Sequence, residues 1–134
     1  MKKNGKHIFR ALFLLYLAAV LFLCFGNFSD LSSAPKTILG FESDKVVHFL
    51  MFFPFPILFY LSFERPARRP WQGILLLLGI LFLGSVIAVG TECIQDLIPY
   101  RGADKADFLA DFLALCCSTA LILPFEIKKT LDHA

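Results

Sequence analysis

The chain has 134 residues, of which 57% are hydrophobic, and its mean hydropathy is +0.70. A soluble domain of this length buries only about 60–70% of the surface that its unfolded chain exposes, so it could not hide this much apolar area, whereas lipid can. The net charge of +2 is modest, and no basic stripe with interleaved aromatic residues is present, so the sequence argues against a nucleic-acid-binding class.

Four apolar stretches predict four transmembrane helices. The stretches cover about residues 11–26, 46–63, 74–91 and 108–125, and each approaches the roughly 20 residues that cross a bilayer. With their flanks, the helices are expected at about 8–28, 46–63, 72–91 and 107–125. The stretches lack strand-like alternation, and backbone polar groups in lipid must be satisfied within a helix. The sequence therefore predicts an all-α membrane bundle that forms one domain over residues 1–134.

The first stretch also has features of a signal peptide, because Lys2, Lys3, Lys6 and Arg10 precede it. Its apolar run is longer than a usual signal-peptide core, and the nearest small-residue cleavage site, at residues 32–34, lies too far beyond Gly26. We therefore expect an uncleaved helix.

The distribution of basic residues predicts that both termini are cytoplasmic. The N-terminus, the 64–73 loop and the C-terminal tail hold nine Lys and Arg, while the two other loops hold four. Acidic residues show the opposite bias, which the positive-inside rule does not require. Eight Asp and Glu fall on the predicted outer side: Asp30, Glu42, Asp44, Glu92, Asp96, Asp104, Asp107 and Asp111.

The spacing of the outer polar residues predicts a binding site. Asp44 and His48 are four apart, and Glu92 and Gln95 are three apart, so each pair shares a helix face. We predict one polar cluster at the outer mouth of the bundle, formed by Asp44, Lys45, His48, Glu92, Gln95, Arg101, Asp104, Asp107 and Asp111. The alternative is that these residues only solvate helix ends, with Asp44 and Asp107 as N-terminal caps. That alternative does not account for His48, Glu92 or Asp111, which lie too deep or at the wrong helix end.

Prolines and cysteines give two further expectations. Pro54 and Pro56 lack backbone N–H groups, so they predict a kink in the second span, and a widened cavity beneath His48 is a more specific alternative that is compatible with the kink. The four cysteines show no metal-binding spacing, and we expect no metal and no cofactor. A disulfide between Cys24 and Cys93 remains open, because both lie near the same membrane face.

Three short motifs resemble those of VanZ-like membrane proteins. Residues 44–48 (DKVVH) resemble the family's D-K-x-x-H, residues 92–95 (ECIQ) its E-x-x-Q, and Arg101, Asp107 and Asp111 its R…D-x-x-x-N segment. Asp111 replaces the usual Asn, and Ala114 a common Gly. The resemblance implies a four-helix protein of the bacterial cytoplasmic membrane and a link to resistance against the glycopeptide teicoplanin.

Three functions then compete. The first is a non-enzymatic cell-envelope protein whose outer cluster binds a lipid headgroup, a lipid-linked cell-wall precursor or a glycopeptide, with Lys45, His48 and Arg101 meeting an anionic phosphate. The second is a membrane enzyme, because a histidine with carboxylates can perform acid–base or metal-assisted chemistry. The third is a small proton-linked transporter. No residue is identified as catalytic, membrane lipid is the expected surrounding partner, and oligomerisation is left open.

Overall fold

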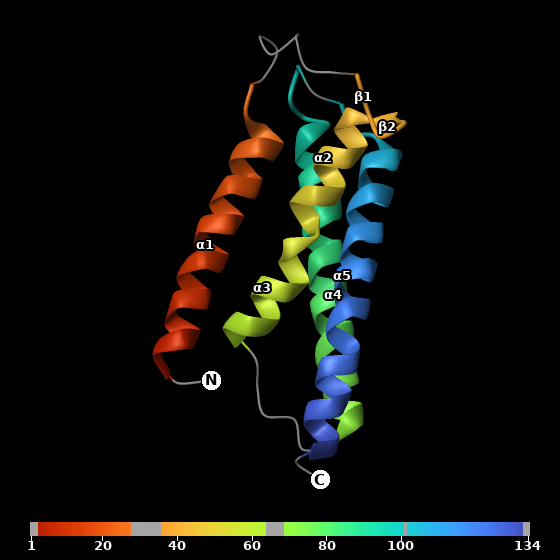
Figure 1. The fold of residues 1–134 in the computed structure, drawn as a ribbon. Helices are drawn as coiled ribbons and strands as arrows, with labels where there is room; N and C mark the ends of the chain where they lie inside the picture. Colours follow the sequence, from red (N-terminus) through yellow and green to blue (C-terminus); the bar gives the residue numbers. More distant parts are fainter. Residues whose placement is uncertain (1–2, 28–35, 64–68, 101, 133–134) are drawn as a thin grey trace.

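The computed structural model describes residues 3–27, 36–63, 69–100 and 102–132. The elements are α1 (Lys3–Phe25), β1 (Thr37–Ile38), β2 (Phe41–Glu42), α2 (Ser43–Phe52), α3 (Pro54–Phe63), α4 (Pro70–Gln95) and α5 (Lys105–Asp132) (Figure 1). With α2 and α3 counted as one span, four helical segments are long and apolar enough to cross a membrane. The predicted all-α fold with four membrane-spanning helices is confirmed, and the chain is a multi-pass membrane protein.

The last two helices are longer than their apolar stretches. Helix α4 begins at Pro70, whose missing N–H costs nothing in a first helical turn, and it continues to Gln95. Helix α5 begins after Asp104, whose carboxylate accepts a 2.8 Å hydrogen bond from the Ala106 N–H, and it continues to Asp132. Apolar length underestimates both helices because their ends carry polar residues that cap or pack.

The second span is interrupted at the two prolines. Helix α2 ends at Phe52 and α3 begins at Pro54, as the missing N–H groups predict. Phe52 and Phe55, on either side of the break, are each 1% exposed. Packed aromatic side chains therefore fill the interior beside the break, where the sequence had suggested a widened cavity.

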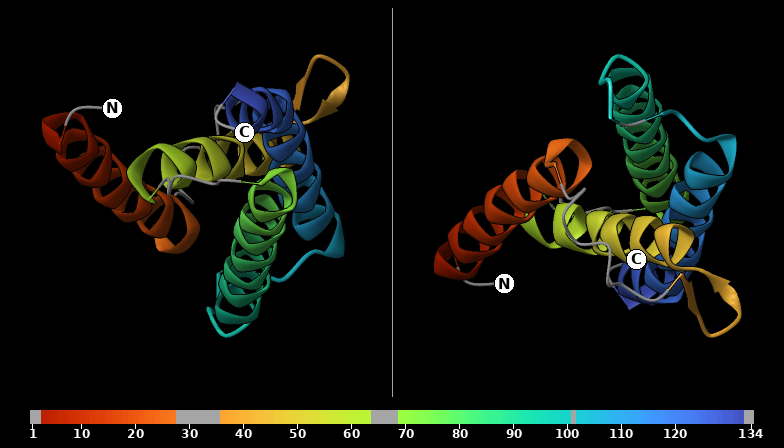
Figure 2. Two further views of the ribbon diagram at one scale, coloured as in Figure 1. Left: turned by 90° about the horizontal axis from the view of Figure 1, so that it is seen from below. Right: turned by 90° about the horizontal axis from the view of Figure 1, so that it is seen from above.

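The helices pack in two groups that share the second span. Helix α5 packs against α4 and α2, whereas α1 packs mainly on α3 and leans away from α5 (Figures 1 and 2). The contact between α1 and α3 is aromatic: the centroid of the Phe13 ring lies 5.7 Å from the ring centroid of Phe55 and 5.6 Å from that of Phe59. Part of the high phenylalanine content therefore belongs to this helix interface.

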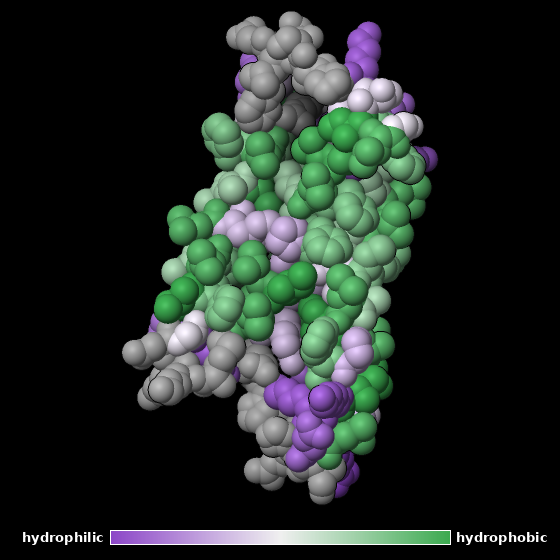
Figure 3. Space-filling model, viewed as in Figure 1, coloured by the Kyte–Doolittle hydropathy of each residue, from purple (hydrophilic) through white to green (hydrophobic). Residues whose placement is uncertain are grey.

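Gly84 permits a close approach between α4 and its neighbours. A Cβ atom built on Gly84 would lie 2.7 Å from Leu115 of α5 and 3.1 Å from Phe55 of α3. Small residues at helix contacts allow such packing within membranes. On the outside, apolar side chains cover the middle of the molecule in the view of Figure 3, and hydrophilic ones gather toward its two ends. This distribution fits a bilayer around the middle of the bundle.

A short hairpin precedes α2 and was not predicted. Strands β1 and β2 pair in an antiparallel register, with Thr37 opposite Glu42 and Ile38 opposite Phe41. The connecting residues Leu39 and Gly40 have φ values of 53° and 85°, so both adopt the positive φ of a two-residue type I′ turn. The hairpin places Glu42 beside the first turn of α2. The first turn of α1 and the last turn of α5 lie at the opposite end of the bundle (Figure 1).

Candidate functional site

Three helices bring the predicted polar residues together at the hairpin end of the bundle. Asp44, Lys45 and His48 lie in the first turns of α2, while Glu92 lies in the last turn of α4. Asp107 lies in the first turn of α5, one turn before Asp111. Because α2 and α4 both pack against α5, these helix ends converge. We call this set the acid–histidine cluster: Asp44, Lys45, His48, Glu92, Asp104, Asp107 and Asp111.

Lys45 holds the exposed side of the acid–histidine cluster together. Its Nζ atom lies 2.6 Å from Asp104 Oδ2, 2.8 Å from Asp107 Oδ1 and 3.2 Å from Glu42 Oε2. Asp44 is more distant, at 4.0 Å, and its carboxylate is largely exposed. The hydrogen bond from Lys45, aided by that from the Ala106 N–H, lowers the pKa of Asp104 below its ordinary value. The ammonium group is therefore already occupied by carboxylates of this chain.

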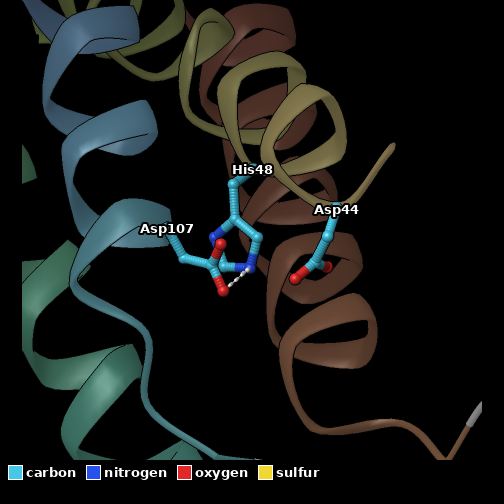
Figure 4. A group of neighbouring side chains, drawn as sticks. All are labelled: Asp44, His48 and Asp107. Atoms are coloured by element: carbon cyan, nitrogen blue, oxygen red, sulfur yellow. Dashed lines mark ion pairs between the residues drawn. The ribbon is translucent and has the colours of Figure 1, made fainter. Parts of the chain in front are cut away.

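His48 occupies the buried centre of the cluster and is only 3% exposed. Its Nδ1 atom lies 3.1 Å from Asp111 Oδ1 and 3.8 Å from Glu92 Oε1. On the other side of the ring, Nε2 lies 3.7 Å from Asp107 Oδ2, the contact dashed in Figure 4. Both ring nitrogens thus face carboxylates. The imidazole can donate a proton to one of them or exchange it with a bound molecule.

Glu92 joins α4 to the segment before α5. Its Oε2 atom accepts a 3.2 Å hydrogen bond from the Asp104 backbone N–H, while its Oε1 atom is buried without a hydrogen-bond partner among the described residues. Asp111 Oδ2 is in the same state. Buried carboxylates normally have partners, so these two oxygens mark the interior of the cluster as a place for a cation or a hydrogen-bond donor.

Gln95, one of the predicted site residues, does not join the acid–histidine cluster. Gln95 is buried, but its Nε2 donates a 3.0 Å hydrogen bond to the Cys24 carbonyl and so fastens α4 to α1. Arg101 lies outside the described residues. The open question of a disulfide is also answered: Cys24 and Cys93 are free cysteines, the first buried and the second exposed.

Sequence reasoning missed one member of the Lys45 network and a second buried polar contact. Glu42 reaches Lys45 from the hairpin, and its i,i+3 spacing was an available signal. At the opposite end of the bundle, the Tyr60 hydroxyl donates a hydrogen bond to Glu126, a carboxylate that is 1% exposed. Glu126 lies on the α5 face that carries Asp111 and Ser118, so continuing the helical spacing past the apolar stretch would have found it.

Metal-ligand residue types form two overlapping groups in this cluster. His48 with Asp44 and Asp107 forms one, and His48 with Glu92 and Asp111 forms the other. Within each group, the atoms that could bind an ion lie within 4.8 Å of one another. The described residues therefore include groups that could hold an ion, and the expectation of no metal stays a prediction.

Comparison with known proteins finds a eukaryotic relative. An uncharacterized protein of Schizosaccharomyces pombe is 38% identical over 87 residues, which cover 65% of this chain and 49% of the yeast protein. The chain thus spans about half the length of this relative. No protein-family model matches the chain, and no solved structure matches it.

These findings correct the predicted family. Membership of the VanZ-like family is wrong, because no family model matches the sequence and the relative comes from a yeast. The expected link to glycopeptide resistance and the bacterial cytoplasmic membrane came with that resemblance and lose their support with it. The motifs misled because each contains only two or three fixed residues. Six residues of these motifs nevertheless lie together in the acid–histidine cluster: Asp44, Lys45, His48, Glu92, Asp107 and Asp111.

Proposed function

We propose that this membrane protein binds an amphiphilic molecule at the hairpin end of its bundle. The observation that carries the proposal is an apolar groove of about 320 Å³ between α2 and α5, which shares Lys45 with the acid–histidine cluster. The other groove residues are apolar: Phe41, Val46, Phe49, Leu50, Ala110 and Leu113. An amphiphile whose apolar tail lay in this groove would have its headgroup at the exposed side of the acid–histidine cluster.

The charges of the cluster favour a headgroup with hydrogen-bond donors. The sequence suggested that Lys45, His48 and Arg101 would meet an anionic phosphate, but carboxylates already surround the Lys45 ammonium and the His48 ring. Asp44 and Asp104 are exposed carboxylates at this end that can accept hydrogen bonds. We therefore propose a ligand headgroup that offers hydroxyl or amine donors, such as a sugar or an ethanolamine.

We also propose that this end faces away from the cytosol. The basic residues outnumber acidic ones on the side of both termini, which lie at the other end of the bundle (Figure 1). Single cysteines can be introduced at positions 36, 68 and 102 of a variant without the four native cysteines. An impermeant maleimide added to intact cells should label positions 36 and 102 and spare 68. Labelling at position 68 alone would show the opposite orientation, with the hairpin end of the bundle facing the cytosol.

Binding can be tested in phosphatidylcholine nanodiscs doped with one fluorescent lipid at a time. The lipids are a monogalactosyl diacylglycerol, a phosphatidylethanolamine and a phosphatidylglycerol. We expect the wild-type protein to retain the galactolipid and the phosphatidylethanolamine. Leu50→Trp, which fills the groove, should weaken their retention about tenfold, which corresponds to about 1.4 kcal/mol. Leu75→Trp is the matched control, because Leu75 is similarly exposed on α4 and outside the groove. Equal retention of all three lipids by both variants would refute the proposal.

A second candidate function is acid–base catalysis on the bound headgroup. It is favoured by one observation: each ring nitrogen of His48 faces a carboxylate, at 3.1 Å and 3.7 Å. Such a buried histidine can pass a proton between two partners. His48→Gln should then abolish turnover while leaving lipid retention within about twofold, a free-energy change of roughly 0.4 kcal/mol. Loss of retention together with turnover would indicate a binding role.

The described residues give less support to the third candidate function, proton-linked transport. Between Asp111 and Glu126, the buried face of α5 carries the apolar Ala114, Leu115 and Ile122 with the polar Ser118 among them, so mostly apolar side chains separate the two buried carboxylates. A proton pathway needs polar groups or water across that distance. We therefore carry lipid binding and headgroup chemistry forward.

A further inference from the structure

Three side chains from three different helices converge in the buried half of the acid–histidine cluster. They are His48 of α2, Glu92 of α4 and Asp111 of α5, which are 3%, 7% and 0% exposed. His48 Nδ1 lies 3.1 Å from Asp111 Oδ1 and 3.8 Å from Glu92 Oε1. One imidazole nitrogen and two carboxylates therefore point toward a common centre.

The two carboxylates also have unused acceptor atoms. Glu92 Oε1 and Asp111 Oδ2 are buried and accept no hydrogen bond within the described part of the chain. Burying an isolated ionised carboxylate carries a desolvation penalty of roughly several kcal/mol, even after the protein relaxes around it. Glu92 Oε1 and Asp111 Oδ1 both face His48 Nδ1, so a cation between the three residues would neutralise both carboxylates.

We propose that His48 Nδ1, Glu92 and Asp111 bind a divalent first-row transition metal, such as Zn²⁺ or Mn²⁺. Ligand atoms about 2.0–2.2 Å from tetrahedral zinc lie about 3.3–3.5 Å from each other, and the two measured separations bracket this range. Mixed imidazole and carboxylate ligands suit this class of metal better than Mg²⁺ or Ca²⁺, which prefer oxygen alone. A dication with two carboxylates and a neutral imidazole is also electrically neutral, which favours it in a buried site.

The surrounding residues are arranged to support this ligand set. His48 Nε2, the nitrogen that would not bind the metal, faces Asp107 Oδ2 at 3.7 Å. Asp107 is in turn held by Lys45 at 2.8 Å, and Glu92 Oε2 is held by the Asp104 N–H at 3.2 Å. A histidine ligand commonly donates its second N–H to a carboxylate, which fixes the ring and its tautomer. Three protein ligands leave a coordination position open for water or a headgroup oxygen.

The alternative ligand group lies on the other side of the imidazole. Asp44 and Asp107 flank Nε2 there (Figure 4). Asp44 is exposed, and Asp107 already pairs with Lys45. Asp107 Oδ1 is buried without a hydrogen bond, as Glu92 Oε1 and Asp111 Oδ2 are, but its charge is already compensated by the Lys45 ammonium 2.8 Å away. The proposal commits to the Nδ1 side, and the two sides can be separated by mutation.

The experiment measures metal binding to the full chain in detergent, after chelator treatment and without added lipid. Zn²⁺ and Mn²⁺ are titrated by calorimetry, bound metal is counted by mass spectrometry, and Co²⁺ absorption reports the ligand field. We expect one ion per chain, and at least about tenfold weaker binding in Glu92→Gln and Asp111→Asn. Asp44→Asn is the matched control and should stay within about threefold of the wild type, or about 0.65 kcal/mol. Far-UV circular dichroism checks that each variant remains helical.

Several results would overturn the proposal. They are the absence of stoichiometric binding to the helical wild-type chain, a preference for Mg²⁺ or Ca²⁺, or a larger loss in Asp44→Asn than in Glu92→Gln. The last result would place the ion on the Nε2 side. Because no lipid is present, failure of lipid retention leaves this test unaffected, and failure of metal binding leaves the groove assay unaffected.

Discussion

His48 and Asp111 are 63 positions apart in the sequence, yet His48 Nδ1 and Asp111 Oδ1 lie 3.1 Å apart in the bundle interior. The contact ties α2 to α5 at a depth where both side chains are shielded from solvent. Hydrogen bonds to charged groups are among the stronger ones in proteins, and an unpaired partner at this depth is costly. The pair therefore fixes the relative position of the two helices that line the groove.

Lys45 should be the most important cation for stability at this end of the molecule. Replacing it in Lys45→Met leaves Asp104 and Asp107 without their shared ammonium, and Asp107 is buried. We expect the free energy of unfolding to fall by about 1.5–3 kcal/mol, the usual range for hydrogen bonds to charged groups. The measurement is unfolding in mixed detergent micelles, followed by circular dichroism.

The control for this prediction is the neighbouring cation Lys105. It lies at the same end of the bundle and is exposed, so Lys105→Met should change stability by no more than about 0.5 kcal/mol. Equal effects of the two substitutions would mean that only the total charge at this end matters, and the specific role of Lys45 would be wrong.

Gly84 should be intolerant of any side chain. In Gly84→Ala, the new methyl group would meet Leu115 at 2.7 Å and Phe55 at 3.1 Å, so α4 would have to move away from two neighbours. Overpacking of this kind costs about 1–3 kcal/mol. Gly79→Ala on the same helix is the matched control, because nothing lies within 4 Å of its added carbon. It should be neutral or slightly stabilising, because Ala favours a helix more than Gly does, and a comparable loss there would show that the effect at Gly84 does not come from its contacts with Leu115 and Phe55.

How far the sequence predicts this molecule depends on how local each signal is. Apolar length predicts the four spans, and the 3–4 spacing of polar residues predicts that His48, Glu92 and Asp111 turn inward, because both signals lie within single helices. Which groups meet across helices is set by packing. The sequence therefore did not show that Lys45 pairs with Asp104, 59 positions away, or that Gln95 binds the Cys24 carbonyl.

Two local features escaped prediction for different reasons. The hairpin before α2 is only two residues long on each side, so it carries no recognisable strand pattern, although Gly40 marks its turn. Glu126 follows the last apolar stretch and was counted with the solvated tail. It is buried because α5 continues to Asp132 and packs its polar face against α3 and α4.

The titration of Asp104 should report on its ion pair. Its pKa is lowered in the folded chain, so the charged carboxylate adds stability above the unfolded value of about 3.9, and this is lost as pH falls through the folded pKa. Carboxyl-carbon NMR of the labelled protein should place the midpoint below that value. Lys45→Met should raise the midpoint, whereas Lys128→Met, at the opposite end of α5, should not. An unchanged midpoint in Lys45→Met would contradict the pairing.

The contact between Tyr60 and Glu126 should stabilise the other end of the bundle. Tyr60→Phe removes the hydroxyl donor and leaves a buried carboxylate beside Lys129, whose Nζ lies 3.6 Å from Glu126 Oε2. Losing one partner of a buried acceptor costs about 1–3 kcal/mol, and detergent unfolding should show a loss in that range. Tyr100→Phe is the control, since that hydroxyl is exposed and makes a longer 3.3 Å contact with the Phe25 carbonyl.

A double-mutant cycle distinguishes this contact from general packing. Glu126→Gln keeps the size of the side chain, and its combination with Tyr60→Phe should cost at least about 0.5 kcal/mol less than the sum of the single changes, because both remove the same interaction. Metal binding at the acid–histidine cluster should be unaffected in all three variants, since the two sites lie at opposite ends of α5. Strict additivity would show that the hydroxyl and the carboxylate stabilise the helices independently.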